Sequence, residues 1–217
     1  MRELAAMART KSEARRLEII RVAAQLFERE GYERTSMSEV ADRLGGSKQT
    51  LYNYFRSKEE LLRAVLQQDL GEGVEQIIKA WGGGRDLKKD LTRLAIAWLT
   101  RRLEPQPIAN IRIVANQPTE SGLGEEFFTN VMRPNAERVC QIFESLMNEG
   151  RIKKAKPWTA AMQWKGLIEQ DLLERRLLGA MPKVDPRELD AAAKSGTEAF
   201  LAIYATESAA TKPSRRS

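Results

Sequence analysis

The chain has 217 residues, of which 42% are hydrophobic and 30% charged, and its formal net charge is +6, a composition typical of soluble globular proteins. The sequence has no run of about 18 apolar residues, which excludes a membrane span, and the single cysteine excludes an internal disulfide and fits a reducing cytoplasm. Without histidine, the usual zinc sites and nucleophilic triads cannot form, so we expect no metal, no cofactor and no enzyme activity.

The N-terminal quarter carries most of the excess positive charge. Up to Lys58 there are 12 basic and 8 acidic residues, which indicates a polyanionic partner. Apolar residues recur at spacings of three and four, and Ser36 with Glu39 forms one predicted capping box while Ser57 with Glu60 forms another. The helices predicted from these signals cover residues 12–30, 36–44, 47–55 and 57–81.

The remainder of the chain is also predicted to be helical. A triple glycine at residues 82–84 separates the two halves, and prolines punctuate the second. The predicted helices lie at about residues 87–103, 108–114, 134–150, 157–178 and 186–205. We see no strand alternation, so the fold class is all-α. We expect a DNA-binding domain at residues 12–58, a regulatory and dimerisation domain at 59–206, and disorder at 1–11 and 207–217.

The helices at 36–44 and 47–55, joined by a glycine pair, have the order of a helix-turn-helix. An ordinary helical hairpin has the same order, so the direction of each side chain decides between the two. At about 100° per residue, Leu51 and Phe55 point into the core while Gln49 and Asn53 point outward. Tyr52 and Tyr54 fall about 80° to either side of the core direction by the same geometry.

This outward face suits duplex DNA. Amide side chains bond adenine edges, and Lys48 can reach guanine or a phosphate. A tyrosine on each flank can direct its hydroxyl to a phosphate, and helix starts attract phosphate as well. The predicted DNA-binding residues are Thr35, Ser36, Ser38, Ser47, Lys48, Gln49, Thr50, Tyr52, Asn53, Tyr54 and Lys58.

The run TSMSEVADRLGGSKQTLYNYFRSKEELLRAVL, with AAQLFEREGYERTS before it, resembles the amino-terminal domain of the TetR family of transcriptional regulators. The resemblance implies that residues 47–55 are the recognition helix and that Lys58 contacts the DNA backbone. Gly46 departs from the pattern, because Val or Ile is more usual there, and this change loosens the turn.

The C-terminal half resembles the AefR-like branch of the same family through FFTNVMRP, LMNEGRI and AAMQWKGLIEQDLLERRLLG. That resemblance implies a small-molecule site and a homodimer built from the last two helices. Candidate pocket residues are Trp98, Arg112, Phe127, Phe128, Met132, Met162, Trp164 and Asp171. Candidate dimer residues are Ile168, Leu172, Ala192, Gly196 and Ala199. Aromatic and Met stripes are also typical of plain core, and the small-residue stripe also fits packing inside one chain.

We therefore predict a cytoplasmic, homodimeric, ligand-responsive repressor that binds a pseudo-palindromic operator. An activator or an effector-independent regulator of the same fold stays open. An all-helical enzyme and a protein-interaction module are less favoured by the sequence.

Overall fold

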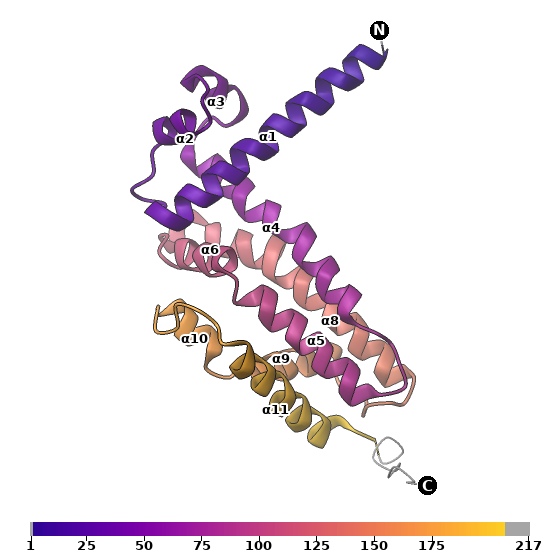
Figure 1. Cartoon of the computed structure of the whole chain (residues 1–217). Helices are drawn as coiled ribbons and strands as arrows, with labels where there is room; N and C mark the ends of the chain where they lie inside the picture. Colours follow the sequence, from indigo (N-terminus) through magenta and orange to yellow (C-terminus); the bar gives the residue numbers. More distant parts are fainter. Residues whose placement is uncertain (1, 207–217) are drawn as a thin grey trace. The chain divides into compact units, whose positions relative to one another are not determined.

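The computed structural model describes residues 2–206, except for the side chains of residues 2–11 and 69–76. Within that range the chain forms helices, an isolated bridge between Ile152 and Ala205, and no strand, so the predicted all-α class is confirmed (Figure 1). The helices are α1 (Arg2–Glu30), α2 (Met37–Arg43), α3 (Lys48–Tyr54), α4 (Lys58–Ala80), α5 (Leu87–Arg102), α6 (Pro105–Ala115), α7 (Leu123–Phe127), α8 (Arg133–Asn148), α9 (Pro157–Glu169), α10 (Leu172–Leu177) and α11 (Pro186–Tyr204). A 3₁₀ turn at Thr119–Ser121 precedes α7, and a π-helical turn at Phe128–Met132 precedes α8.

Backbone contacts divide the chain into two compact units. The first contains the chain up to Leu70 together with Ala109–Phe127, and the second contains Gly71–Ile108 and the chain from Phe128 onward. The sequence placed the boundary after residue 58. The structure places it later because the first turns of α4 bury Leu61 and Leu62 in the first unit, where Arg63 also binds Glu126 at 2.9 Å.

Helix α1 is longer than the sequence analysis expected. Residues 2–11 were expected to be disordered, whereas α1 is helical from Arg2. The stretch is rich in Ala, Leu, Met, Glu and Arg, which are strong helix formers, and it lacks Gly and Pro. Residues 207–217, which were also expected to be disordered, lie outside the described residues.

The core of the first unit follows from the apolar face of α1. Ile19, Ala23 and Phe27 are buried there at spacings of four, and Phe27 meets Tyr32 edge to face at 5.2 Å. Gly31 ends α1 with φ of 89°, a left-handed conformation that favours glycine. The turn after α1 thereby directs the chain into α2.

Both predicted helix starts in this unit can be compared with the structure. The Glu39 N–H donates to Ser36 Oγ at 3.2 Å, and the Ser36 N–H donates to a Glu39 carboxylate oxygen at 2.6 Å, which completes the first capping box. At α4 the Glu60 N–H donates to Ser57 Oγ at 3.1 Å, but the Glu60 carboxylate accepts from the Arg56 N–H instead. The second capping box is therefore only half formed.

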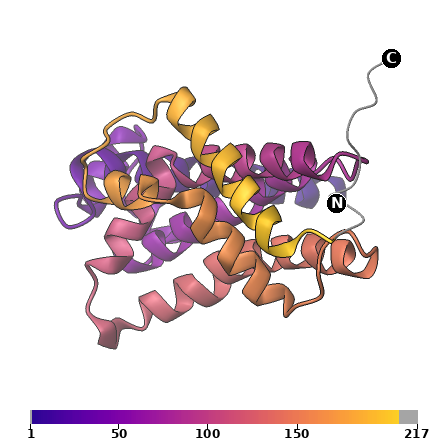
Figure 2. The same ribbon diagram turned by 90° about the horizontal axis from the view of Figure 1, so that it is seen from below.

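The second unit has an aromatic core. Helix α11 packs against α5 and α9, and α8 packs against α9; α9 and α11 run side by side in Figure 2. Trp164 lies 5.8 Å from both Trp98 and Phe143, in edge-to-face geometry. Phe200 stacks between Phe143 and Tyr204 at 5.0 Å and 4.7 Å. These rings join four helices into one core.

One predicted helix is broken. The sequence indicated a single helix over residues 157–178, whereas α9 ends at Glu169 and α10 begins at Leu172. Gln170 between them has φ of 46°, the one positive value at a described residue other than glycine. That conformation costs about 1–3 kcal/mol for such a residue, so the surrounding packing must hold it. Since the break involves neither Gly nor Pro, it could not be predicted from the residue types at this position.

The small-residue stripe of α11 packs inside the chain. Ile168, Leu172 and Ala192 are buried. A Cβ added to Gly196 would lie 2.5 Å from the Leu167 carbonyl oxygen and 2.7 Å from the Ile168 Cα. These four candidate dimer residues therefore have no surface left for a partner, which corrects the sequence interpretation. Ala199 is half-buried.

Candidate nucleic-acid interface

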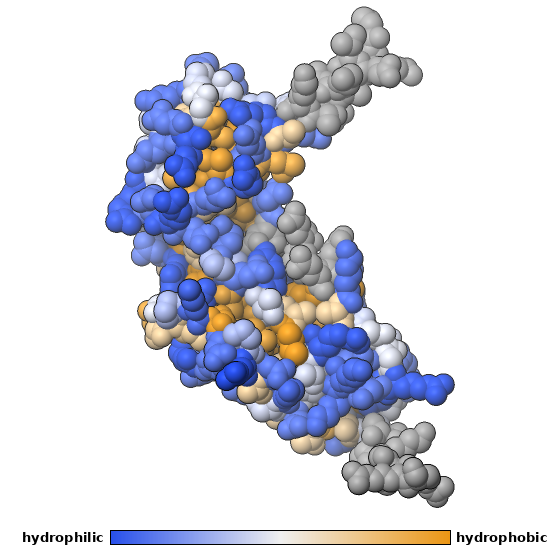
Figure 3. Space-filling view, in the orientation of Figure 1, coloured by the Kyte–Doolittle hydropathy of each residue, from blue (hydrophilic) through white to orange (hydrophobic). Residues whose placement is uncertain are grey.

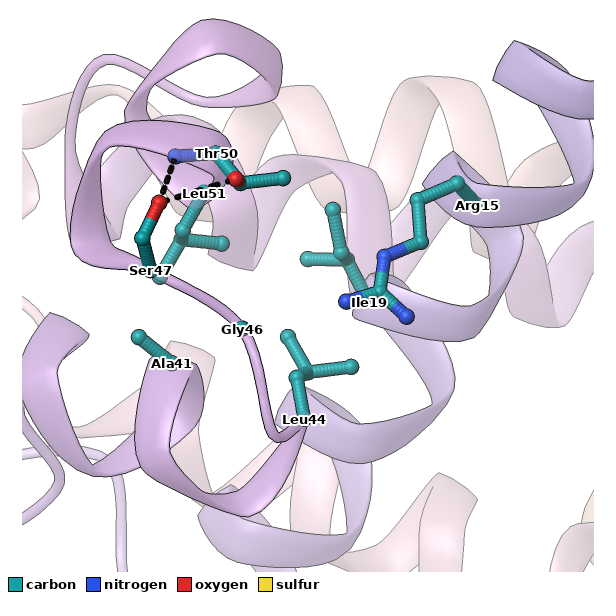
Figure 4. A pocket seen from close by; sticks show the side chains of 8 residues that line it. All are labelled: Arg15, Ile19, Ala41, Leu44, Gly46, Ser47, Thr50 and Leu51. Carbon is teal, nitrogen blue, oxygen red and sulfur yellow. Dashed lines mark hydrogen bonds between the residues drawn. The ribbon is translucent and has the colours of Figure 1, made fainter.

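The start of α3 is fixed by local hydrogen bonds. Gly45 has φ of 63°, and the chain then extends to Ser47, the cap of α3. The Thr50 N–H donates to Ser47 Oγ at 3.1 Å, and the two hydroxyls lie 2.9 Å apart (Figure 4). These bonds use the hydroxyls of both residues within the protein, although the side chain of Ser47 remains exposed.

The buried side of α3 is the one that the helical geometry predicted. Leu51 and Phe55 are each 1% exposed, and the Arg16 guanidinium lies 5.2 Å above the Phe55 ring. Two buried apolar residues one turn apart fix the rotation of a short helix about its axis. The opposite side must then face away from the core.

That opposite side is polar. Lys48, Gln49 and Asn53 are exposed, and Gln49 Nε2 donates to Asn53 Oδ1 at 3.3 Å, so the two amides lie side by side one turn apart. The two tyrosines differ, because Tyr52 is 47% exposed whereas Tyr54 is half-buried. Figure 3 shows a mostly hydrophilic surface around α2 and α3.

Of the candidate residues at the start of α2, Thr35 has a different environment from the two serines. Thr35 is 3% exposed, and its hydroxyl donates to the Gly31 carbonyl at 2.9 Å. Its predicted phosphate contact is therefore wrong: the hydroxyl closes the turn after α1. Ser36 is exposed and Ser38 half-buried. The Ser36 hydrogen bonds hold the pKa of Glu39 below its usual value, with the backbone bond as the largest cause.

Lys58 binds within the protein. Its ammonium group donates to the carbonyls of Tyr32 and Glu33 at 2.9 Å and 3.3 Å, and it lies 4.3 Å from the centre of the Tyr32 ring. Burial, aided by Glu59 and Glu33, raises the pKa of Tyr32 to about 12. Lys58 thus ties the start of α4 to the turn after α1.

The candidate pocket residues are divided between the two units and differ in their surroundings. Trp98 and Trp164 belong to the aromatic core, and Met162 packs against that core. Phe127 is buried in the first unit and Arg112 is exposed there. In the second unit Met132 is half-buried, while Phe128 and Asp171 are exposed. Arg112, Phe128 and Asp171 are open to solvent, and their role in a ligand pocket stays a prediction.

The sequence analysis did not predict a buried ionic cluster in the second unit. It consists of Arg102, Lys165 and Glu169, together with Trp98. Glu169 accepts from Trp98 Nε1 at 2.9 Å and Lys165 Nζ at 2.8 Å, and Arg102 Nε lies 3.7 Å away without a hydrogen bond. Burial lowers the pKa of Arg102, and Glu169 opposes that shift. The sequence drew attention to Asp171, but the buried acid lies two residues earlier, one helical turn after Lys165 and on its side of α9.

Metal-ligand clusters and membrane spans are both absent from the described residues. In that part of the chain no three His, Cys, Asp or Glu side chains gather as metal ligands. None of the described helices is both long and apolar enough to cross a bilayer.

A short helix whose polar side projects outward, preceded by a tight glycine turn and a second short helix, defines a helix-turn-helix DNA-binding module. Two family models identify the family. Residues 19–65 match the bacterial regulatory proteins of the TetR family, and residues 89–206 match the C-terminal domain of AefR-like transcriptional repressors. The chain therefore belongs to the TetR family, with an AefR-like C-terminal domain. Its members are transcriptional regulators rather than enzymes, which confirms the prediction on activity.

Curated relatives match over the DNA-binding region. The regulator YfiR of Bacillus subtilis is 36% identical over 66 residues, which are 30% of this chain and 32% of the relative. The transcriptional activator FasR of Mycolicibacterium smegmatis is 40% identical over 74 residues, which are 33% of this chain and 34% of the relative. The matches thus span about a third of each relative.

Solved structures match over nearly the whole chain. A structure described as a TetR-family regulator from Mesorhizobium loti has a TM-score of 0.83 and 26% identity, and the match covers 90% of this chain and 98% of that one. The flavonoid-responsive regulator FrrA has a TM-score of 0.67 and 27% identity, with 89% and 99% covered. Both support the fold of the two units.

Proposed function

We propose that this protein is a ligand-responsive transcriptional repressor that binds a pseudo-palindromic operator as a homodimer in the cytoplasm. The observation that carries the DNA-reading part is the side-by-side, exposed pair of Gln49 and Asn53 on α3, opposite the buried Leu51 and Phe55. Each amide retains donors and acceptors beyond their single mutual bond, so the pair has capacity for base edges.

We assign roles within this interface by exposure. Lys48, Gln49 and Asn53 read bases in the major groove, and the exposed hydroxyl of Tyr52 contacts a phosphate on one side. Lys58 is already bound to the Tyr32 and Glu33 carbonyls, so we assign it to orientation of α4 rather than to a full phosphate contact. Phosphate contacts from Ser36, Ser38, Ser47, Thr50 and Tyr54 remain part of the proposal.

The homodimer requires a surface other than the buried stripe. On α11, Ile203 is 51% exposed and Ala199, one turn earlier, is half-buried. Two apolar side chains one turn apart, one exposed and one partly exposed, suit a helix–helix contact with a second copy. A two-fold dimer presents two recognition helices about 34 Å apart, one DNA turn, which explains why the operator is expected to be pseudo-palindromic.

The effector is proposed to bind the AefR-like domain and to favour a state in which the recognition helices are wrongly spaced. Such a switch needs different affinities for the two states. FrrA, with a similar fold, is flavonoid-responsive by name, which supports a small-molecule effector. Since FasR is named as an activator, activation by this chain is a second candidate, favoured by that relative alone.

The test begins with selection of bound fragments from random DNA by the full-length protein. We expect a fragment with two inverted half-sites, bound by two protomers, and release of the protein by one compound class in a subsequent screen. Enrichment of a single, non-repeated half-site bound by a monomer would contradict the proposal. A transcription assay on the selected fragment placed at a promoter separates a repressor from an activator.

A further inference from the structure

Gly46 leaves room for a charged side chain of α1 beside the recognition helix. The residues around it form a shallow hollow between α1 and the turn, with Ser47 and Thr50 on its far side (Figure 4). A Cβ added to Gly46 would lie 3.0 Å from the terminal nitrogen Nη2 of Arg15. The Arg15 guanidinium thus lies close to where the side chain of a Val or Ile at position 46 would begin.

Among the described side chains, Arg15 forms one ion pair. Its Nη1 donates to a Glu18 carboxylate oxygen at 2.7 Å, and the two side chains are 31% and 44% exposed. An ion pair so open to solvent contributes little to stability and exchanges readily for another anion. A guanidinium also has more donors than one carboxylate oxygen uses, and its planar fork matches phosphate.

We propose that Arg15 is a DNA-phosphate contact beside the start of α3, and that Glu18 holds the same guanidinium in the unbound protein and competes with DNA for it. The inference rests on DNA binding by the helix-turn-helix. When α3 enters the major groove, the capping residue Ser47 lies next to a groove wall. A side chain that lines the same hollow and approaches Gly46, the residue before Ser47, is then within reach of that strand's phosphates.

The experiment compares full-length variants on two labelled duplexes, the fragment selected above and a random sequence of equal length, over a salt series. Arg15→Ala should weaken binding to both duplexes by about tenfold and lower the slope of log K against log salt by about 0.9 per protomer. Arg29→Ala is the control, because it removes the same charge from α1 about 21 Å from Arg15. It should leave the slope nearly unchanged.

Glu18→Gln distinguishes competition from general charge repulsion. It should tighten binding about threefold when Arg15 is present and change it little in the Arg15→Ala background, because a screened surface charge acts weakly at a distance. Equal tightening in both backgrounds would overturn the proposal, as would an unchanged salt slope for Arg15→Ala. Thermal unfolding midpoints matching the parent confirm that each variant folds, and Arg15→Lys, which keeps the charge, should retain the slope.

The random duplex separates this inference from the proposed function. If the parent protein does not prefer the selected fragment, operator reading fails while the Arg15 effects remain measurable on random DNA. If the parent prefers the fragment but Arg15→Ala matches Arg29→Ala, the inference alone fails.

Discussion

The outer side of α3 and the buried ionic cluster of the second unit are two polar groups in opposite surroundings. Gln49 and Asn53 share one 3.3 Å bond in open solvent. Glu169, which is 5% exposed, accepts from both Trp98 and Lys165. The exposed pair keeps unused hydrogen-bond donors and acceptors, whereas both carboxylate oxygens of the buried Glu169 accept hydrogen bonds from neighbouring side chains. The difference indicates that the first group is available to an outside partner, whereas the second holds α5 and α9 together.

The largest effect is expected in the buried cluster. Glu169→Ala leaves Lys165 and Arg102 without their acid, and removal of one partner of a buried ion pair costs about 3–5 kcal/mol. Urea unfolding at pH 7 measures the loss. Asp171→Ala, two residues away but exposed, should change the free energy of unfolding by less than about 0.5 kcal/mol. Similar losses in the two variants would remove the distinction between buried and exposed acids.

The packing of α11 on α9 gives the next effect. Gly196→Ala places a methyl group against the α9 backbone and should destabilise the protein by about 1–3 kcal/mol through overpacking. Gly166→Ala in α9 meets open space and should stabilise it by about 0.5–1 kcal/mol through helix propensity. Sedimentation with urea unfolding checks both. If Gly196→Ala weakens only dimer association, the stripe lies between chains.

The exposed pair should affect recognition and leave stability unchanged. Asn53→Ala or Gln49→Ala should lose about 1–3 kcal/mol of discrimination at one or two base pairs. Binding to single-base variants of the selected fragment measures this loss. As a control, Tyr52→Phe should lower the affinity for all DNA sequences about equally, because a phosphate contact carries no base information. An unchanged base preference for both amide variants would show that this side of α3 does not read DNA.

The smallest effect concerns Tyr32, a buried group in the otherwise polar surroundings of the interface. Its pKa is raised to about 12 in the folded protein from 10.0, so the folded state keeps its proton longer. The corresponding stability is fully present below pH 10 and is lost as the pH rises toward 12. In Tyr32→Phe the free energy of unfolding should fall less steeply between pH 10 and pH 12 than in the parent, and it should be nearly the same as in the parent at pH 7. Urea unfolding at a series of pH values measures both. Parallel curves for parent and variant would contradict the raised pKa.

The sequence predicted the rotation of α3 well because Leu51 and Phe55 are its only large apolar pair, and a helix this short has one way to bury both. It also predicted the capping box at Ser36, since that signal is local. The family models confirm the TetR and AefR-like resemblances, which identified the regulator. The rotation of α3 and the capping box both depend on residues within a few turns of one another.

Other features were not predictable, because the residue pattern alone does not decide which partner a side chain finds. Thr35 resembled a phosphate ligand, but the position of the Gly31 carbonyl decides its hydrogen bond. The stripe at Ala192 and Gly196 fits either a second chain or α9, and only the fold distinguishes them. Likewise, the helix breaks at Gln170, and Asp171, the next residue, is exposed. The positive φ of Gln170 is held by packing and is not set by residue type, so the sequence did not predict it.

The bridge between Ile152 and Ala205 has a consequence for chain topology. The Lys153 N–H donates to the Tyr204 carbonyl at 2.7 Å, and the Thr206 hydroxyl donates to the Gly150 carbonyl at 3.0 Å. Residues 150–206 therefore form a loop whose two ends are fastened together by hydrogen bonds. Lys183, between α10 and α11, is exposed, so a protease can cut this loop there. The two fragments would stay together, because the hydrogen bonds between residues 150–153 and 204–206 and the contact between α9 and α11 still join them.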